Sequence, residues 1–299
     1  MGNVKDAIWK SPDLQMHLVV FLWGGTAILG KLISVSGPVL VWHRIWMTVL
    51  VLAIIPGVLT KIKHFSKKNW LHLGIIGVLT ALHWVCFYGS IKIANSASVA
   101  LSALATSTFF AAILEPLLTQ AKFEKFNLFL AVLVFIGVRL IFMDEGIHAG
   151  AFGIAILAAF LSALFSTLNK KWATSLDAKS ATLVELGIGF VFLSFVLPVF
   201  TGWDNLWSEI VPLPGDWIYL IILSVFCTAF TFVVALHCLK YISAFKSNLY
   251  VNLEPVYGIL MASVLFNELE ELSLHFVLGA VIIISTVFIK PFLKRIVKL

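Results

Sequence analysis

The hydrophobic pattern of this chain consists of long apolar runs separated by short polar connections. A run of about 20 apolar residues is long enough to cross a bilayer as an α-helix. Ten such runs can be counted, so the pattern predicts an all-α integral membrane protein with ten transmembrane helices. The expected spans are residues 14–34, 39–59, 70–92, 96–120, 126–143, 150–171, 181–201, 217–238, 244–266 and 273–292.

The composition strengthens this interpretation. Hydrophobic residues make up 61% of the 299 positions, charged residues only 12%, and the mean hydropathy is +1.02. A soluble domain has no use for so much apolar surface. The connections are too short to hold a soluble domain, and the first apolar run lacks a signal-peptide cleavage pattern, so we expect it to be a retained span.

Basic residues are distributed unevenly over the connections. With the N-terminus inside, 17 of the 21 Lys and Arg residues fall on the inward side, whereas the outward connections carry acids. This positive-inside pattern predicts a multi-pass protein of the cell or inner membrane with both termini cytoplasmic. It also accounts for the net charge of +6 without a nucleic-acid partner. The inward residues are Lys5, Lys10, Lys61, Lys63, Lys67, Lys68, Lys122, Lys125, Lys170, Lys171, Lys179, Lys240, Lys246, Lys290, Lys294, Arg295 and Lys298.

One run, 244–266, has a carboxylate and a proline in its middle. Glu254 lies near the expected hydrocarbon midplane, where a carboxylate is costly, so it should face a protein interior or a wet cavity. Pro255 should kink the helix at that depth. Tyr250, Glu254 and Tyr257 lie at i, i+4 and i+7, which predicts one polar helix face that binds substrate.

The environment expected for Glu254 suggests a coupling role. Its ionised form would be poorly solvated, so we expect the carboxyl to be often protonated near neutral pH and to link proton binding to cargo movement. The alternative is a structural role, in which a protonated Glu254 is bonded to a neighbouring helix and Pro255 only shapes the kink.

An internal repeat divides the chain near its middle. The segment Ile91–Ala97 precedes the fourth expected span as Leu239–Ala244 precedes the ninth, about 147 residues later. We therefore expect two five-helix repeats, 1–147 and 148–299. Because five is odd, the repeats should have inverted topology. Thr108 occupies the position that matches Pro255, so the proline occurs in one repeat only.

These features together resemble the EamA-type family of the drug/metabolite transporter superfamily over nearly the whole chain. The resemblance implies a ten-helix carrier with a central cavity, of a kind that often exports amino acids or related metabolites. The family pattern usually has Gly where this chain has Asn267. The residues that carry the likeness are Leu22–Gly25, Pro38, Arg44, Lys240–Ala244, Leu253–Tyr257, Leu265–Glu268 and Gly279.

Arg44 is the strongest candidate for contact with an anionic cargo group. It is one of four cations expected near the outer ends of spans, with Lys31, Lys92 and Arg139. His43 and Trp46 flank Arg44 and are included as substrate-binding candidates. The alternative is that these cations reach the interface and pair with acids such as Asp144 and Glu145, while the aromatic residues form an interfacial belt.

Other polar residues fall inside the expected spans. His83, Trp84 and Tyr88 in the third span are candidates for substrate binding, and the unperturbed pKa of a histidine also suits a proton relay. A neutral His83 bonded to a neighbouring helix is the structural alternative. Glu115 and Glu185, near inner span ends, are candidates for gating or coupling; the alternative is that they are acids that snorkel to the interface.

The chain lacks motifs that would indicate an enzyme or a resident cofactor. It contains no P-loop, zinc-binding H-E-x-x-H or G-x-S-x-G pattern, and its three cysteines lie inside apolar runs. We therefore expect no cofactor and no metal. The predicted function is a secondary-active transporter, in particular an exporter, whose partners are a small metabolite, the bilayer and protons. A passive facilitator and a membrane-embedded enzyme are the alternatives, and the sequence does not determine the oligomeric state.

Overall fold

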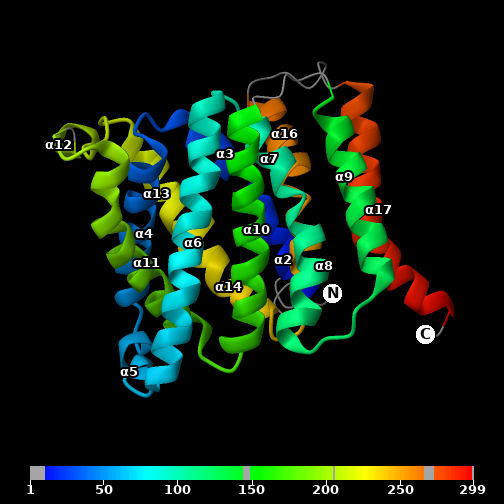
Figure 1. Cartoon of the computed structure of the whole chain (residues 1–299), viewed down its shortest axis with the longest axis horizontal. Coiled ribbons are helices and arrows are strands. Elements are labelled where there is room, and N and C mark those ends of the chain that lie inside the picture. Colours follow the sequence, from blue (N-terminus) through cyan, green and yellow to red (C-terminus); the bar gives the residue numbers. More distant parts are fainter. Residues whose placement is uncertain (1–10, 144–148, 205, 266–272, 298–299) are drawn as a thin grey trace, which may run out of the picture.

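The computed structural model describes residues 11–143, 149–204, 206–265 and 273–297. Over these residues the chain forms helices, turns and short connections, without a strand. The long helices lie side by side and alternate in direction along the chain (Figure 1). The expected all-α class is therefore confirmed. Asn267 and Glu268, which form part of the family pattern, lie outside the described residues.

The helices of the first half correspond to the first five expected spans. The first and fourth of these spans are each divided into two helices, and one short helix, α5, lies between spans. The bounds are α2 (Pro12–Gly24), α3 (Thr26–Leu32), α4 (Gly37–Ala53), α5 (Val58–Ile62), α6 (Lys67–Ala94), α7 (Ala97–Leu104), α8 (Ser107–Thr119) and α9 (Lys125–Ile141).

The second half follows the remaining five expected spans. Its third span is interrupted by a turn of π-helix, η1, and its fourth is again divided in two. The bounds are α10 (Ala149–Trp172), α11 (Ala178–Thr201), α12 (Leu206–Glu209), α13 (Asp216–Ser224), η1 (Val225–Phe230), α14 (Thr231–Cys238), α15 (Ala244–Val251), α16 (Glu254–Leu265) and α17 (Leu274–Val297).

Six helical stretches of the described chain are long and apolar enough to cross a membrane. The α4 helix and the segment Leu274–Ile289 of α17 are shorter apolar helices. That all ten expected spans cross the bilayer stays a prediction. The six stretches are Pro12–Leu32, Lys67–Ala94, Val99–Thr119, Ala149–Trp172, Ala178–Thr201 and Asp216–Cys238.

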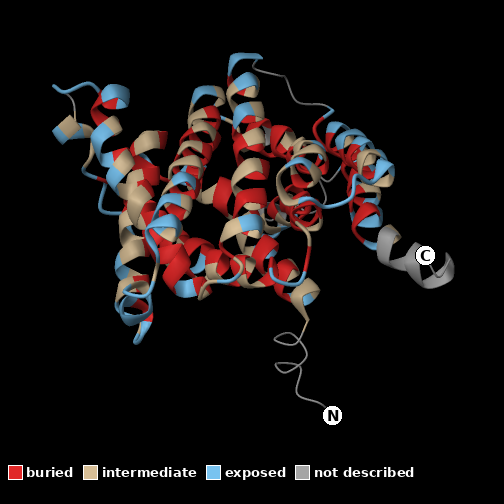
Figure 2. Cartoon of the chain, turned by 60° about the horizontal axis from the view of Figure 1, so that its bottom comes forward, coloured by how far each residue is buried: buried red, intermediate tan, exposed pale blue. Residues whose placement is uncertain are grey.

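The outer surface of the helix bundle is rich in large apolar side chains. Buried residues gather on the faces that helices turn toward one another, and exposed residues lie on the outward faces (Figure 2). Phe195, Val199 and Leu117 are each more than 70% exposed. Such a surface would favour aggregation of a soluble protein, whereas it matches the apolar tails of a bilayer.

The helix breaks follow the expected internal repeat. The fourth span is interrupted at Ala105–Thr106 and the ninth at Asn252–Leu253. The two breaks are 147 residues apart, as are the helices that follow them, which begin at Ser107 and Glu254. The break expected near Pro255 is therefore present, and an equivalent break occurs in the first repeat without a proline.

Close helix crossings explain Gly24 and Gly279 of the family pattern, and also Gly77. A Cβ atom on Gly24 of α2 would lie 3.0 Å from the backbone nitrogen of Gly258 in α16. A Cβ on Gly279 of α17 would contact the backbone oxygen of Gly137 in α9, and one on Gly77 of α6 would overlap the carbonyl oxygen of Glu185. Small residues at such crossings allow the tight packing that holds helices together in lipid.

Candidate substrate cavity

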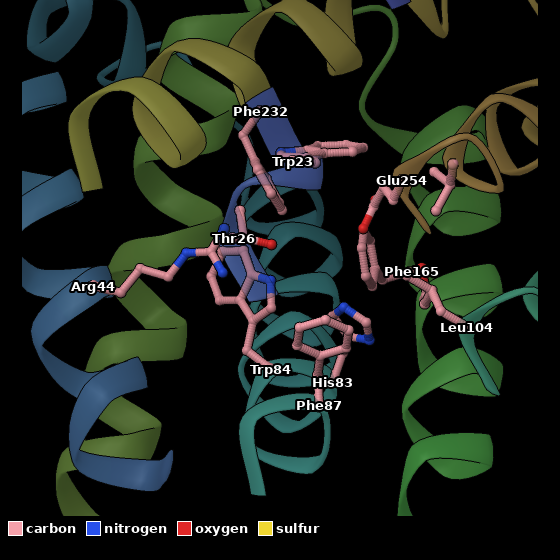
Figure 3. A pocket seen from close by; sticks show the side chains of 12 residues that line it. Trp23, Thr26, Arg44, His83, Trp84, Phe87, Leu104, Phe165, Phe232 and Glu254 are labelled. Carbon is pink, nitrogen blue, oxygen red and sulfur yellow. The ribbon is translucent and has the colours of Figure 1, made fainter. Parts of the chain in front are cut away.

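A small cavity, here called the central chamber, lies between the helices of both halves. Its volume is about 50 Å³, and helices α2, α3, α4, α6, α7, α10, α14, α15 and α16 contribute to its walls (Figure 3). Most of the lining is aromatic or apolar, with one cation, one histidine and one carboxyl. The lining residues are Trp23, Thr26, Arg44, His83, Trp84, Phe87, Leu104, Ser162, Phe165, Phe232, Val251 and Glu254.

Glu254 contributes the carboxyl of the central chamber. It is the first residue of α16, directly after the break in the ninth span, and it is only 5% exposed. Figure 3 shows its side chain directed into the chamber. Among the described residues, none forms an ion pair with Glu254 or donates a side-chain hydrogen bond to it. Pro255, the second residue of α16, stands in the first turn, where a missing N–H is tolerated.

Arg44 lines the chamber and is held by three hydrogen bonds. It is 2% exposed, and its Nε, Nη1 and Nη2 donate to Thr228 Oγ1 at 2.7 Å, Tyr88 Oη at 2.9 Å and the Cys227 carbonyl oxygen at 3.2 Å. Its guanidinium carbon lies 4.0 Å from the centroid of the Trp84 ring. These bonds use three of the five guanidinium N–H groups, so two remain that can donate to a ligand. Tyr88 thus supports Arg44 and does not itself line the chamber.

Two of the three acceptors of Arg44, Thr228 and Cys227, belong to the π-helix η1. Thr228 Oγ1 also donates to the carbonyl oxygen of Leu223 in α13 at 2.6 Å, while Thr48 of α4 donates at 3.0 Å to the carbonyl oxygen of Ser224, the residue before η1. The widened turn is therefore attached to α4 at two levels, by Arg44 and by Thr48. Turns of this kind are common at functional sites. The sequence analysis missed Cys227 and Thr228, since no local pattern marks a π-helical turn.

Aromatic side chains surround the remaining volume. His83 is 7% exposed, and its Nδ1 lies 2.7 Å from the Ala158 carbonyl oxygen, so Nδ1 carries the hydrogen and donates. In the neutral ring, Nε2 is then an acceptor. The ring centroids of Trp84 and Phe232 are 4.9 Å apart, and those of Phe165 and His83 are 5.4 Å apart. The structure thus brings His83, Trp84, Arg44 and Glu254 to one chamber.

Two further substrate-binding candidates of α4, His43 and Trp46, lie outside the central chamber. The Nε2 of His43 donates to the Ile210 carbonyl oxygen at 2.7 Å, and its Nδ1 accepts from Trp46 Nε1 at 3.0 Å. His43 also has its ring 5.6 Å from that of Trp217. These contacts join α4 to the segment that leads into α13, and neither His43 nor Trp46 lines the central chamber.

The expected single face of Tyr250, Glu254 and Tyr257 is interrupted. Tyr250 belongs to α15 and the other two residues to α16, so the helical spacing does not continue across the break. Both tyrosines meet His17 of α2: Tyr257 Oη lies 3.0 Å from His17 Nδ1, and the Tyr250 ring lies 5.0 Å from the His17 ring. Glu254 alone of the three lines the chamber.

The other two acidic candidates have separate positions. Both oxygens of Glu115 accept backbone hydrogen bonds, from the Ala244 N–H at 2.7 Å and the Phe245 N–H at 2.9 Å. Glu115 therefore caps the start of α15. Glu185 is buried between α6, α10 and α11 and accepts from Thr80 Oγ1 at 3.1 Å.

The three remaining outer cations are not in the central chamber. Lys92 donates to the Ile33 carbonyl oxygen, Arg139 Nη1 donates to the Phe142 carbonyl oxygen at 3.3 Å, and Lys31 is exposed. Their expected partners Asp144 and Glu145 lie outside the described residues. No group of three or more His, Cys, Asp or Glu side chains that could hold a metal ion occurs in the described ranges.

The fold and the internal chamber define a helical membrane protein built from two related halves. The chain belongs to the EamA-like transporter family, whose model matches residues 10–143 and 150–290. Both halves of the chain are therefore matched, and the resemblance seen in the sequence is confirmed. This membership, with the apolar helices, makes the chain a multi-pass membrane protein of the drug/metabolite transporter superfamily.

The fold has a close counterpart among solved structures. One crystal structure, described only as "Crystal structure of protein", superposes with a TM-score of 0.76 at 14% sequence identity. The match covers 97% of this chain and 99% of that chain. At this identity the likeness establishes the fold alone. No curated protein matches the chain.

Proposed function

We propose that this chain is a secondary-active transporter that exports a small metabolite, such as an amino acid, by alternating access. The observation that carries the proposal is the position of Glu254. A buried carboxyl stands at a helix break, faces an aromatic chamber, and has no ion-pair partner among the described residues. Such a group is stable as the neutral acid or when a cationic group of the cargo neutralises it. Proton and cargo can therefore compete for Glu254.

Arg44 supplies the positive charge in the lining of the chamber. Its N–H groups that are not bound to Thr228, Tyr88 or Cys227 can meet a carboxylate or another anionic group of the cargo. The guanidinium fork binds such groups bidentately, and the Trp84 ring keeps it in place. A cation and a carboxyl in one chamber suit a cargo with both charges, while the aromatic wall suits its apolar part.

Separate sets of hydrogen bonds at the two ends of the bundle support alternating access. At one end Glu115 caps α15 through the Ala244 and Phe245 N–H groups. At the other, Asp216 of α13 accepts from the Ser34 backbone N–H at 3.0 Å and from Ser34 Oγ at 2.5 Å. If the hydrogen bonds at one end broke while those at the other end remained, the chamber would open to one side of the membrane only.

The topology is part of the proposal. Ten spans in two inverted repeats, with both termini cytoplasmic, are supported by the matched breaks at Ala105–Thr106 and Asn252–Leu253. The lysine-rich connections also support it: α5, the α8–α9 connection and the end of α10 lie at the lower end of the molecule in Figure 1. That end would face the cytoplasm. We propose no enzymatic activity.

The proposal is tested with Glu254→Gln in proteoliposomes. Gln keeps the shape of the protonated acid and removes its titration, so the variant should retain cargo exchange and lose accumulation driven by a proton gradient. Asp204→Asn, which removes an exposed carboxyl, is the matched control and should behave as the parent. Gradient-driven accumulation by Glu254→Gln at the parental rate would disprove the coupling role, and a parent that ignores the gradient would be a passive facilitator.

A further inference from the structure

A second cavity, here called the lower chamber, lies next to the central chamber. Its volume is about 40 Å³, and its polar lining comes from α10, α11 and α15. Trp23, Phe165 and Phe232 line both chambers. The Phe232 ring lies 5.8 Å from that of Trp23 and 6.3 Å from that of Phe165, and the three side chains are labelled in Figure 3. An aromatic partition therefore separates the two chambers.

The lower chamber contains a carboxyl with no positive partner. Glu185 is 1% exposed and lines the cavity. Its Oε1 accepts from Thr80 Oγ1 at 3.1 Å and from Asn169 Nδ2 at 3.4 Å. Within the described chain, no Lys, Arg or His forms an ion pair with Glu185.

Asn169 adds an unused acceptor to the same cavity. It is 5% exposed, lines the lower chamber, and its Oδ1 accepts no hydrogen bond from the described residues. A buried amide oxygen without a donor is uncommon, because it loses its hydration with no compensation. The cavity is large enough to hold a water-sized group beside this oxygen.

The chemistry of these oxygens specifies the ligand. A carboxyl and an amide oxygen together offer acceptors and negative charge, so the complementary group carries N–H donors and a positive charge. The aromatic rings of the partition also favour a cation over an anion. We propose that the lower chamber binds the ammonium group of an amine-bearing cargo through Glu185 and Asn169. This inference rests on the proposed transport function and adds a second station, at the cytoplasmic side of the aromatic partition.

The two chambers define a short route for such a cargo. Lys170 and Lys171, in the last turn of α10, directly follow Asn169 of the lower chamber, whereas Arg44 and Glu254 line the central chamber. An ammonium group would thus meet Glu185 first on the way from the cytoplasm and Glu254 afterwards. Movement of the ammonium group between the two chambers requires a change of side-chain rotamer at Trp23, Phe165 or Phe232.

The test measures thermal unfolding of the purified full chain with methylammonium chloride. Tetramethylammonium chloride and sodium chloride at the same ionic strength are the comparison salts, because they supply positive charge without N–H donors. Methylammonium should raise the unfolding midpoint of the parent more than either comparison salt does. The specific rise should be lost in Glu185→Gln and reduced in Asn169→Leu, and it should persist in Asp204→Asn.

Several results would overturn the proposal. They are the same rise with all three salts, no rise specific to methylammonium, or an equal rise in the parent and in Glu185→Gln. The midpoint of each variant without added salt shows whether it is folded. Glu254→Gln separates this test from that of the transport proposal, since it should lose gradient coupling yet keep the rise specific to methylammonium.

Discussion

Asn252 donates a hydrogen bond through its side-chain amide to the hydroxyl of Thr108, and this bond joins the two broken helices of the repeats. Thr108 lies in the first turn of α8, and Asn252 lies in the break between α15 and α16. The same hydroxyl donates to the Asn248 carbonyl oxygen at 3.2 Å. Both residues are almost fully buried, so the contact between the start of α8 and the break in the ninth span is a polar junction inside an apolar bundle.

The junction should contribute measurably to stability. Thr108→Val keeps the shape of the side chain and removes its hydroxyl, which leaves the Asn248 carbonyl and the Asn252 amide with fewer partners. We expect a loss of about 1 kcal/mol, measured as a lower unfolding midpoint. Thr119→Val, which removes a partly buried hydroxyl bonded within its own helix, should have a smaller effect. Equal effects of the two variants would contradict a special role for the junction.

The crossing of α6 and α11 should not tolerate a methyl group at Gly77. A Cβ there would overlap the backbone of Glu185, and backbone atoms cannot turn aside. Gly77→Ala should therefore lower the free energy of unfolding by about 1–3 kcal/mol through overpacking. Gly187→Ala is the control, because nothing lies within 4 Å of the corresponding Cβ position in α11. If Gly77→Ala unfolds at the parental midpoint, the close approach of the two helices is wrong.

Replacement of Arg44 should weaken cargo binding. Lys at this position keeps the charge, but it lacks the fork that reaches Thr228, Tyr88 and the Cys227 carbonyl while facing the chamber. We expect Arg44→Lys to reduce affinity by about tenfold or more, which corresponds to about 1.4 kcal/mol. Lys63→Gln, an exposed change in a connection, should bind as the parent does. The measurement is equilibrium binding of an identified cargo, and undiminished binding by Arg44→Gln would refute the role.

The orientation of the bundle can be measured with fusions. A reporter that works only outside the cytoplasm should be inactive when it is fused to Leu299, because the proposed topology places the C-terminus inside. The same reporter fused after Pro212, in the connection between α12 and α13, should be active. Activity at Leu299 would contradict the ten-span arrangement.

Several properties of this protein could be predicted from the sequence because they depend on local composition. The all-α class follows from apolar runs whose length matches a bilayer, and each run can be recognised from its own residues alone. The family could be named from Leu22–Gly25 and Leu253–Tyr257, because these motifs are contiguous. The cavity position of Glu254 was also predictable, since a carboxylate in an apolar run has few tolerable environments.

Other properties were decided only by the tertiary structure. Helical periodicity placed Tyr250 and Tyr257 beside Glu254, but the break at Asn252–Leu253 turns them toward His17, and periodicity holds only within a continuous helix. In the first repeat, the helix of the fourth span is interrupted at Ala105–Thr106, where no proline marks the break in the sequence.

The partners of buried polar groups likewise depend on the fold. Arg44 is more than 180 residues from Thr228 and Cys227 in sequence, and Glu185 is more than 100 from Thr80. Hydrogen bonds act over about 3 Å, so only the packing of distant helices could select these pairs. Local sequence thus determined which segments are apolar helices, whereas long-range packing decided which polar groups share a chamber.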